Sequence, residues 1–380
     1  MDLTELHTEL HTAYKEQYGE PDYLLSVVAE DNLVKPNRLD IAYDFPIEEE
    51  ERYATTLTTL GVATYTMSSP CENAELVMNI LGQQSREDYD KLGMALANLV
   101  WNRLKHELHF APNMVIKNSF IPFFDKMSCL FVMDYGHSDP KWLEGINPVV
   151  RLLEVVPIYE SEANTLERLE EAMITTVFVQ AKGDWDNPHR EPILLLKAAI
   201  NTAWKKIERW YSEEAPIAYQ RLKQGASEDQ IKELEQKMGL VLPEDFVASL
   251  LIHNGGGGFH DYEYLSIDKI YNFWSMMNEL KAEGAFDRYE IKETNRGIIK
   301  NTWWYSHWIP FALDSGGNSI CIDLSPEKNG TYGQIIYKEK EEGPLISNHK
   351  SFFEWLYMYQ KDLYRGCYFV DKDGLIQEKI

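Results

Sequence analysis

The chain has 380 residues, of which 44% are hydrophobic and 26% are charged, ordinary values for a globular protein with room for two domains. Its net charge of −24 lies mostly in the first half: residues 1–195 carry 15 Lys and Arg against 33 Asp and Glu (−18), and the remainder carries 22 against 28 (−6). A negative field of this size opposes binding to nucleic acid and anionic membranes and attracts basic partners, although a role in solubility alone also explains it.

The chain contains no apolar run long enough to cross a membrane, and its start has neither the basic residues nor the apolar core of a signal peptide. A cytoplasmic location is therefore expected. The four cysteines are widely spaced and form no C-x-x-C pair, so neither a disulfide framework nor a metal knuckle is expected. They are Cys71, Cys129, Cys321 and Cys367, and the second and third stand in apolar contexts typical of buried thiols.

Helical and strand-like patterns alternate along the first half. Leu3, Leu6, Leu10 and Tyr14 recur at helical spacing and predict a helix over residues 4–18. Period-two alternation predicts a strand at 38–45. Further strands are expected at 53–60, 75–81, 129–133 and 149–156, and helices at 85–108 and 160–173.

Several short pieces of this half stand in a characteristic order: Leu60-Gly61, Met67-Ser68, Ala74-Glu75-Leu76-Val77, Pro122-Phe123, and Val155-Val156-Pro157 with Glu162. Together with the long predicted helix they resemble a Suppressor-of-fused domain over about residues 23–183. The resemblance implies a binding role. In animals that domain holds a transcription factor, and in bacteria it occurs in proteins that look like toxin immunity factors.

Residues 184–189 are polar and turn-rich, which predicts a domain boundary near residues 186–190. An apolar stripe that includes Leu196, Ala203 and Trp210 predicts a packed connecting helix over 193–212. Ser227, with Gln230 three residues later, has the form of a capping box that opens a helix through residue 238.

Residues 309–324 predict an antiparallel hairpin with one face on a core and one nearer solvent. Apolar residues alternate with others on both sides of a break at 314–318, which supplies residues that tolerate positive φ. Upstream, Leu242-Pro243-Glu244-Asp245-Phe246 opens a helix with Pro243 in its first position, and Asn254-Gly255 ends it.

These segments, in this order, resemble the SUKH superfamily, the Smi/Knr-type domain, over about residues 227–360. The resemblance is carried by Glu233, the segment 242–246, Asn254-Gly255-Gly256, the segment 310–318, Ile322-Asp323 and Phe352-Phe353-x-x-Leu356. It implies a binding protein with no shared catalytic residues. Many known members look like immunity proteins against secreted bacterial toxins, and others are regulatory adaptors.

The sequence predicts no catalytic residue, no cofactor and no metal site. In His106-Glu107-Leu108-His109 the second histidine follows the first by three residues, whereas the zincin motif needs four. The glycine run 255–258 follows a helix and lacks the Lys-Ser/Thr of a phosphate loop, so it is interpreted as a flexible connection from helix to sheet. An enzyme has no positive support.

Partner-binding residues are expected among acidic, polar and aromatic side chains: Glu48, Glu49, Glu50, Glu51, Tyr262, Trp274, Asp314 and Asn318. Consecutive glutamates would steer a basic partner towards the chain, and exposed aromatic rings would anchor it. A structural explanation stays open for each class: a solvated loop for the glutamates and core packing for the aromatic rings.

The sequence therefore predicts an α+β protein of two domains, each with a mixed or antiparallel sheet and flanking helices. Residues 1–190 are expected to form a Suppressor-of-fused-like domain, 191–226 a connecting helix, and 227–380 a SUKH domain with a C-terminal tail. The leading function is an immunity protein that neutralises a cognate bacterial toxin, a basic protein such as a nuclease, by direct binding. The alternative is a cytoplasmic regulatory scaffold or adaptor that binds an endogenous protein. The pattern leaves the oligomeric state open.

Overall fold

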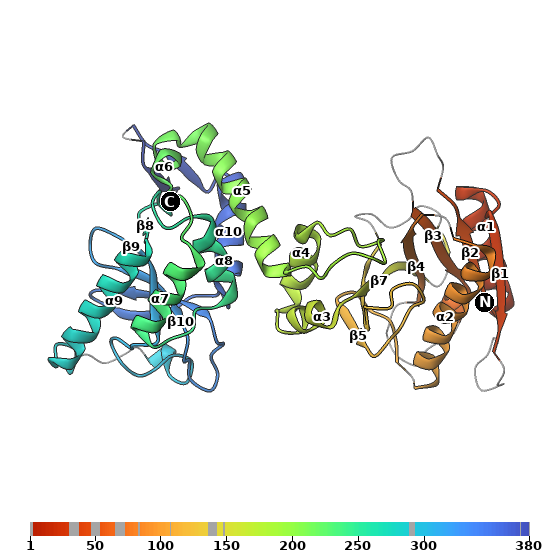
Figure 1. Ribbon diagram of the computed structural model, residues 1–380, viewed down its shortest axis with the longest axis horizontal. Helices are drawn as coiled ribbons and strands as arrows, with labels where there is room; N and C mark the ends of the chain where they lie inside the picture. The colour runs from red at the N-terminus through yellow and green to blue at the C-terminus, as the bar shows by residue number, and fades with distance from the viewer. Residues whose placement is uncertain are drawn as a thin grey trace. The chain divides into compact units, whose positions relative to one another are not determined.

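The computed structural model of the chain describes residues 3–29, 38–46, 54–64, 73–82, 84–106, 108–135, 143–146, 149–288, 293–372 and 374–379. These divide into two compact units, Met1–Ile193 and Leu194–Ile380, which Figure 1 colours from red to yellow-green and from green to blue. The predicted α+β class is confirmed: the first unit has a mixed sheet and the second an antiparallel one, each with flanking helices.

The first unit is built on a seven-stranded sheet of order β1-β2-β3-β4-β7-β6-β5. The β4–β7 pair is parallel and the other neighbours are antiparallel. The strands are β1 (Tyr23–Val28), β2 (Arg38–Asp44), β3 (Ala54–Leu60), β4 (Asn73–Leu81), β5 (Met114–Lys117), β6 (Cys129–Asp134) and β7 (Val150–Ile158). The helices are α1 (Leu3–Tyr18), the 3-10 turn η1 (Val62–Thr64), α2 (Arg86–Lys105), α3 (Glu160–Glu167) and α4 (Glu171–Ala181).

Helices cover both faces of this sheet. Because successive strand residues point to opposite faces, Leu39 and Ile41 of β2 share one buried cluster with α2, while Ala42 lies in a second cluster with α1. Asp40 has the same orientation as Ala42. Its fully buried carboxylate therefore faces α1.

One helix of the first unit differs from expectation, and the predicted boundary segment is closely packed. The helix predicted over 160–173 is two helices, because Glu170 takes an extended conformation (ψ 143°) between α3 and α4. The segment expected as a domain boundary is anchored by Arg190, whose guanidinium pairs with the buried Glu162 at 2.6 and 2.8 Å and lies 4.7 Å from the ring of Trp185. This segment thus packs as part of the first unit.

The second unit contains a five-stranded antiparallel sheet of order β12-β11-β10-β9-β8 and a separate β13–β14 hairpin. The strands are β8 (Glu263–Tyr264), β9 (Trp308–Leu313), β10 (Ser319–Asp323), β11 (Gln334–Glu339), β12 (Gly343–Ile346), β13 (Tyr368–Val370) and β14 (Ile376–Glu378). The helices are α5 (Leu195–Glu214), α6 (Pro216–Arg221), α7 (Glu228–Met238), α8 (Glu244–Ile252), α9 (Ile267–Ala282), η3 (Glu293–Asn295) and α10 (Phe352–Tyr364).

The segment expected as one connecting helix holds both α5 and α6, and both belong to the second unit. Trp204 of α5 is fully buried, and its indole N–H donates to Ser249 Oγ of α8 at 2.8 Å. The helix is therefore part of the core of the second unit.

The predicted hairpin is present as β9 and β10, but the expectation of a face near solvent is wrong. Phe311 packs against Phe352 and Trp355 of α10 on one face, with ring centroids 5.1 and 4.9 Å apart. On the other face Cys321 lies in a buried cluster with Met277 of α9. This second face is covered by α9, a helix that was not predicted from the sequence.

Asp245 explains why two distant segments of the SUKH-like pattern occur together. Its buried carboxylate accepts the backbone N–H of Phe353 at the start of α10, with an N–Oδ2 distance of 2.8 Å. The neighbouring rings of Phe246 and Phe352 lie 5.0 Å apart. One carboxylate thus joins the beginnings of α8 and α10.

The glycine run after α8 links helix to sheet, as expected, but it is closely packed and its conformation is restricted by its neighbours. Gly255, Gly256 and Gly257 all have positive φ. A Cβ on Gly256 would lie 1.9 Å from the carbonyl oxygen of Arg221, so only glycine fits there.

Candidate functional site

Two turns meet at one end of the sheet in the second unit. The β9–β10 turn is closed by Asn318, whose backbone N–H and side-chain amide donate to the two carboxylate oxygens of Asp314 at 2.7 and 2.8 Å. The side-chain oxygen of Asn318 accepts the N–H of Lys340 in the β11–β12 turn at 2.8 Å. This bond fixes the two turns to each other.

Tyr262 lies beside these turns, because β8 begins one residue later and pairs with the end of β9. Burial, followed by the nearby charges of Glu339 and Asp314, raises the pKa of the Tyr262 phenol. Burial also raises the pKa of Glu339, with Asp314 and Glu342 adding to the effect. These four residues, Tyr262, Asp314, Glu339 and Glu342, are named the acidic turn surface. Its carboxylates repel one another, so a cation placed among them would be stabilised.

The predicted partner-binding residues are only partly brought together. Tyr262, Asp314 and Asn318 meet at this end of the sheet. Trp274 lies on α9, where its indole N–H donates to the Ser306 carbonyl at 2.7 Å and its partly buried ring packs against a buried core cluster. The glutamates at positions 48–51 lie outside the described residues.

Two of the cysteines and His106 occupy ordinary structural positions. Cys129 and Cys321 are buried, as expected, and burial raises the pKa of the Cys321 thiol to about 12. Cys71 lies outside the described residues, and His106 is exposed just after α2. In the described part of the chain, no helix combines the length and apolar character needed to span a membrane.

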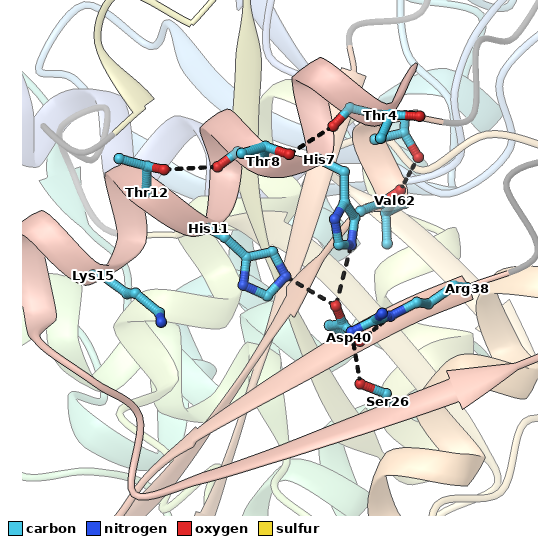
Figure 2. A network of polar contacts seen from close by, with 12 residues as sticks. Thr4, His7, Thr8, His11, Thr12, Lys15, Ser26, Arg38, Asp40 and Val62 are labelled. Carbon is cyan, nitrogen blue, oxygen red and sulfur yellow. Dashed lines mark hydrogen bonds and ion pairs between the residues drawn. The ribbon is translucent and has the colours of Figure 1, made fainter. Parts of the chain in front are cut away.

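A histidine pair in the first unit was not predicted from the sequence. His7 and His11 stand one turn apart on α1, and both rings point towards Asp40 of β2 (Figure 2). Burial opposes ionisation of Asp40, but contacts from His11, His7 and Arg38 hold the pKa of this carboxyl well below its usual range. The four-residue spacing of the histidines was a readable signal, since it places two side chains on one helix face. Their approach to Asp40 depends on the tertiary fold.

Comparison with known proteins bears on the second unit. Residues 225–358 match the model of the SMI1 / KNR4 family (SUKH-1). The predicted SUKH resemblance is confirmed for this segment, called the SUKH segment below. All four residues of the acidic turn surface lie within it.

Three relatives show the range of similar proteins. The glucan synthesis regulatory protein of Neurospora crassa is 26% identical over 213 residues, with 46% of this chain and 40% of that protein covered. The cell wall biosynthesis/cell cycle regulator smi1 of Schizosaccharomyces pombe is 27% identical over 195 residues, covering 47% and 39%. Human F-box only protein 3 is 28% identical over 190 residues, covering 47% and 38%. The chain thus spans about two fifths of these relatives.

Among solved structures, suppressor of fused proteins are similar to the N-terminal half of the chain. A putative homologue from Neisseria gonorrhoeae has a TM-score of 0.36 at 12% identity, with 50% of this chain and 97% of that one covered. Drosophila Suppressor of Fused has a TM-score of 0.37 at 11% identity, with 55% of each chain covered.

Proposed function

We propose that the chain is a non-catalytic regulatory scaffold or adaptor that binds a basic protein partner through the acidic turn surface. The observation that carries this proposal is the position of that surface within the SUKH segment. The fungal relatives that match about half of the chain are named as regulators of glucan synthesis, of the cell wall and of the cell cycle. Their names favour the regulatory alternative over the immunity role that led the sequence-based interpretation.

The geometry suits recognition of Lys or Arg side chains. Asp314 is held by Asn318, whose side-chain oxygen accepts the backbone N–H of Lys340, so the Asp314 carboxylate and the two turns lose little freedom on binding. The ring of Tyr262 is half-buried and offers an aromatic contact beside these charges. Charged groups at such a surface chiefly raise the association rate, while the aromatic contact slows dissociation.

The first experiment is capture of partners by the full chain from its native cell, followed by mass spectrometry and kinetic measurement with the identified protein. We expect Glu339→Gln with Glu342→Gln to slow association by about 3- to 10-fold at low salt and to weaken its salt dependence. Tyr262→Ala should instead speed dissociation by about 10-fold or more.

The matched control is Glu279→Gln with Glu283→Gln, which removes the same charge from exposed positions at the end of α9. It should leave both rates nearly unchanged. A partner bound equally well by the Tyr262 and glutamate variants would refute the acidic turn surface as the binding site. Recovery of a secreted toxin as the partner would favour the immunity role over the regulatory one.

A further inference from the structure

Three side chains of the first unit converge between α1 and β2 (Figure 2). The Nε2 atoms of His7 and His11 lie 3.2 and 3.0 Å from the same oxygen of Asp40, Oδ2. The three ligand atoms all lie within 4.8 Å of one another. We propose that His7, His11 and Asp40 form a binding site for a divalent transition-metal ion, with zinc as the best chemical fit.

The distances suit a tetrahedral ion. Zinc binds histidine nitrogen and carboxylate oxygen at about 2.0–2.2 Å, which places neighbouring ligand atoms about 3.3–3.5 Å apart. The observed nitrogen–oxygen distances are only a few tenths of an ångström shorter. Small rotations of the two imidazoles would therefore admit the ion. Two neutral imidazoles with one carboxylate favour zinc over calcium or magnesium, which prefer oxygen ligands.

Only one of the two histidines has a hydrogen bond that accounts for the position of its ring beside Asp40. His11 Nε2 has hydrogen-bond geometry to Asp40, at 3.0 Å. His7 Nε2 is buried, and among the described residues it has no partner with hydrogen-bond geometry, although the Asp40 oxygen is close. A buried nitrogen in this state carries a free-energy cost, and coordination of an ion would remove it.

The surroundings hold the carboxylate ready for one-oxygen coordination. The second oxygen of Asp40, Oδ1, accepts from Arg38 Nε at 2.9 Å, and Arg38 Nη2 donates to Ser26 Oγ at 3.1 Å. These hydrogen bonds of Arg38 leave Oδ2 of Asp40 facing the histidines. Hydrogen bonds of this kind typically orient metal ligands. The Arg38 charge opposes a second cation, but its side chain is 54% exposed and therefore screened by solvent.

The backbone next to His7 is also shaped to admit its ring. Gly61 follows β3 with φ +126°, and a Cβ there would lie 3.0 Å from Cδ2 and 3.4 Å from Nε2 of His7. Contacts of 3.0–3.4 Å are tighter than ordinary packing, so the imidazole would have to shift. Glycine at this position thus permits the convergence of the three ligands.

The test uses the full chain, freed of metal with a chelator and then titrated with zinc, and with cobalt as a spectroscopic probe. We expect one zinc ion per chain, a melting temperature that rises with zinc concentration, and a cobalt spectrum typical of tetrahedral coordination. His7→Asn and His11→Asn should each weaken zinc binding by about 100-fold or more. Replacing a residue that only orients a metal ligand typically weakens binding by about 10- to 100-fold.

The control is His106→Asn, which removes an exposed histidine from the end of α2 and should leave zinc binding unchanged. Thermal unfolding of each metal-free variant shows that it is folded. A wild-type chain that takes up no zinc at micromolar free zinc overturns the proposal whatever the variants do. So does binding that persists in the folded His7→Asn, His11→Asn double variant.

Discussion

Glu75 is a carboxylate with no exposed surface, and it organises the turn after β3. Its oxygens accept four hydrogen bonds, from the N–H groups of Gly61, Val62 and Ala63 and from the hydroxyl of Thr59. These bonds favour the charged form, but burial outweighs them and raises the pKa of Glu75 to about 7. The group therefore changes charge within the first unit near neutral pH.

This shift predicts a pH-dependent stability. An acid with a higher pKa in the folded chain binds more protons when folded, so its contribution is fully present below its ordinary pKa of 4.5 and is lost as the pH rises through about 7. Unfolding by denaturant between about pH 5 and 8 should show the free energy of unfolding of wild type falling by about 2–3 kcal/mol relative to Glu75→Gln.

The variant should also be less stable than wild type, because its amide N–H₂ cannot accept hydrogen bonds from the N–H groups that surround position 75. The low pKa of Asp40 does not disturb the comparison, since that group loses its stabilising effect only below its ordinary pKa of 3.8. A constant difference between wild type and Glu75→Gln across this range would contradict the predicted titration.

At single residues, prediction succeeded where the signal was local. The capping box of Ser227 and Gln230 is present, since both of its bonds join residues three apart. Asp314 and Asn318 also meet within one turn. By contrast, the side chain of Asp40 contacts histidines about thirty residues away, and no pattern in the sequence fixes such a contact.

At the scale of elements, long periodic segments were predicted well and short or irregular ones were missed. The helix expected at 85–108 is α2, and the strand expected at 38–45 is β2. The edge strand β1 and the four-residue β5 carry too little alternation to identify. The missed α9 was readable, because Ile267, Ile270, Trp274 and Met277 recur at helical spacing.

The glycine run after α8 allows a matched pair of substitutions. Gly256 has φ +82°, and a Cβ there would lie 1.9 Å from the Arg221 carbonyl oxygen, whereas the nearest atom to a Cβ on Gly258 is 3.3 Å away and its φ is not in the left-handed region. Gly256→Ala should destabilise the chain by about 2–4 kcal/mol, and Gly258→Ala by about 1 kcal/mol or less. Equal denaturation midpoints for the two variants would show that the backbone of the glycine run can shift to accommodate a side chain at either position.

At the scale of the whole molecule, the two units are expected to fold as separate domains, each with its own core. The position of Arg190 decides where to cut. A cut after residue 193 keeps Arg190 and Glu162 together in fragment 1–193. Fragments 1–193 and 194–380 should then each unfold cooperatively on heating. A fragment ending at residue 185 leaves Glu162 buried without its partner and should lose about 3–5 kcal/mol.

Differential scanning calorimetry of the three fragments tests both statements. If neither 1–193 nor 194–380 shows a thermal transition, the division into independent domains is wrong. If 1–185 and 1–193 melt together, the segment around Arg190 adds nothing to the stability of the first unit.

The bond from Phe353 to Asp245 also has a kinetic consequence. It closes a loop of 108 residues that contains the whole five-stranded sheet. The entropy of closing a loop grows with its length and must be overcome before the contact contributes any stability. If α7 packs with α8 first, Asp245 has no hydrogen bond from Phe353 until the five-stranded sheet has formed. We expect the second unit to fold slowly for its size, with this long-range closure late in the process.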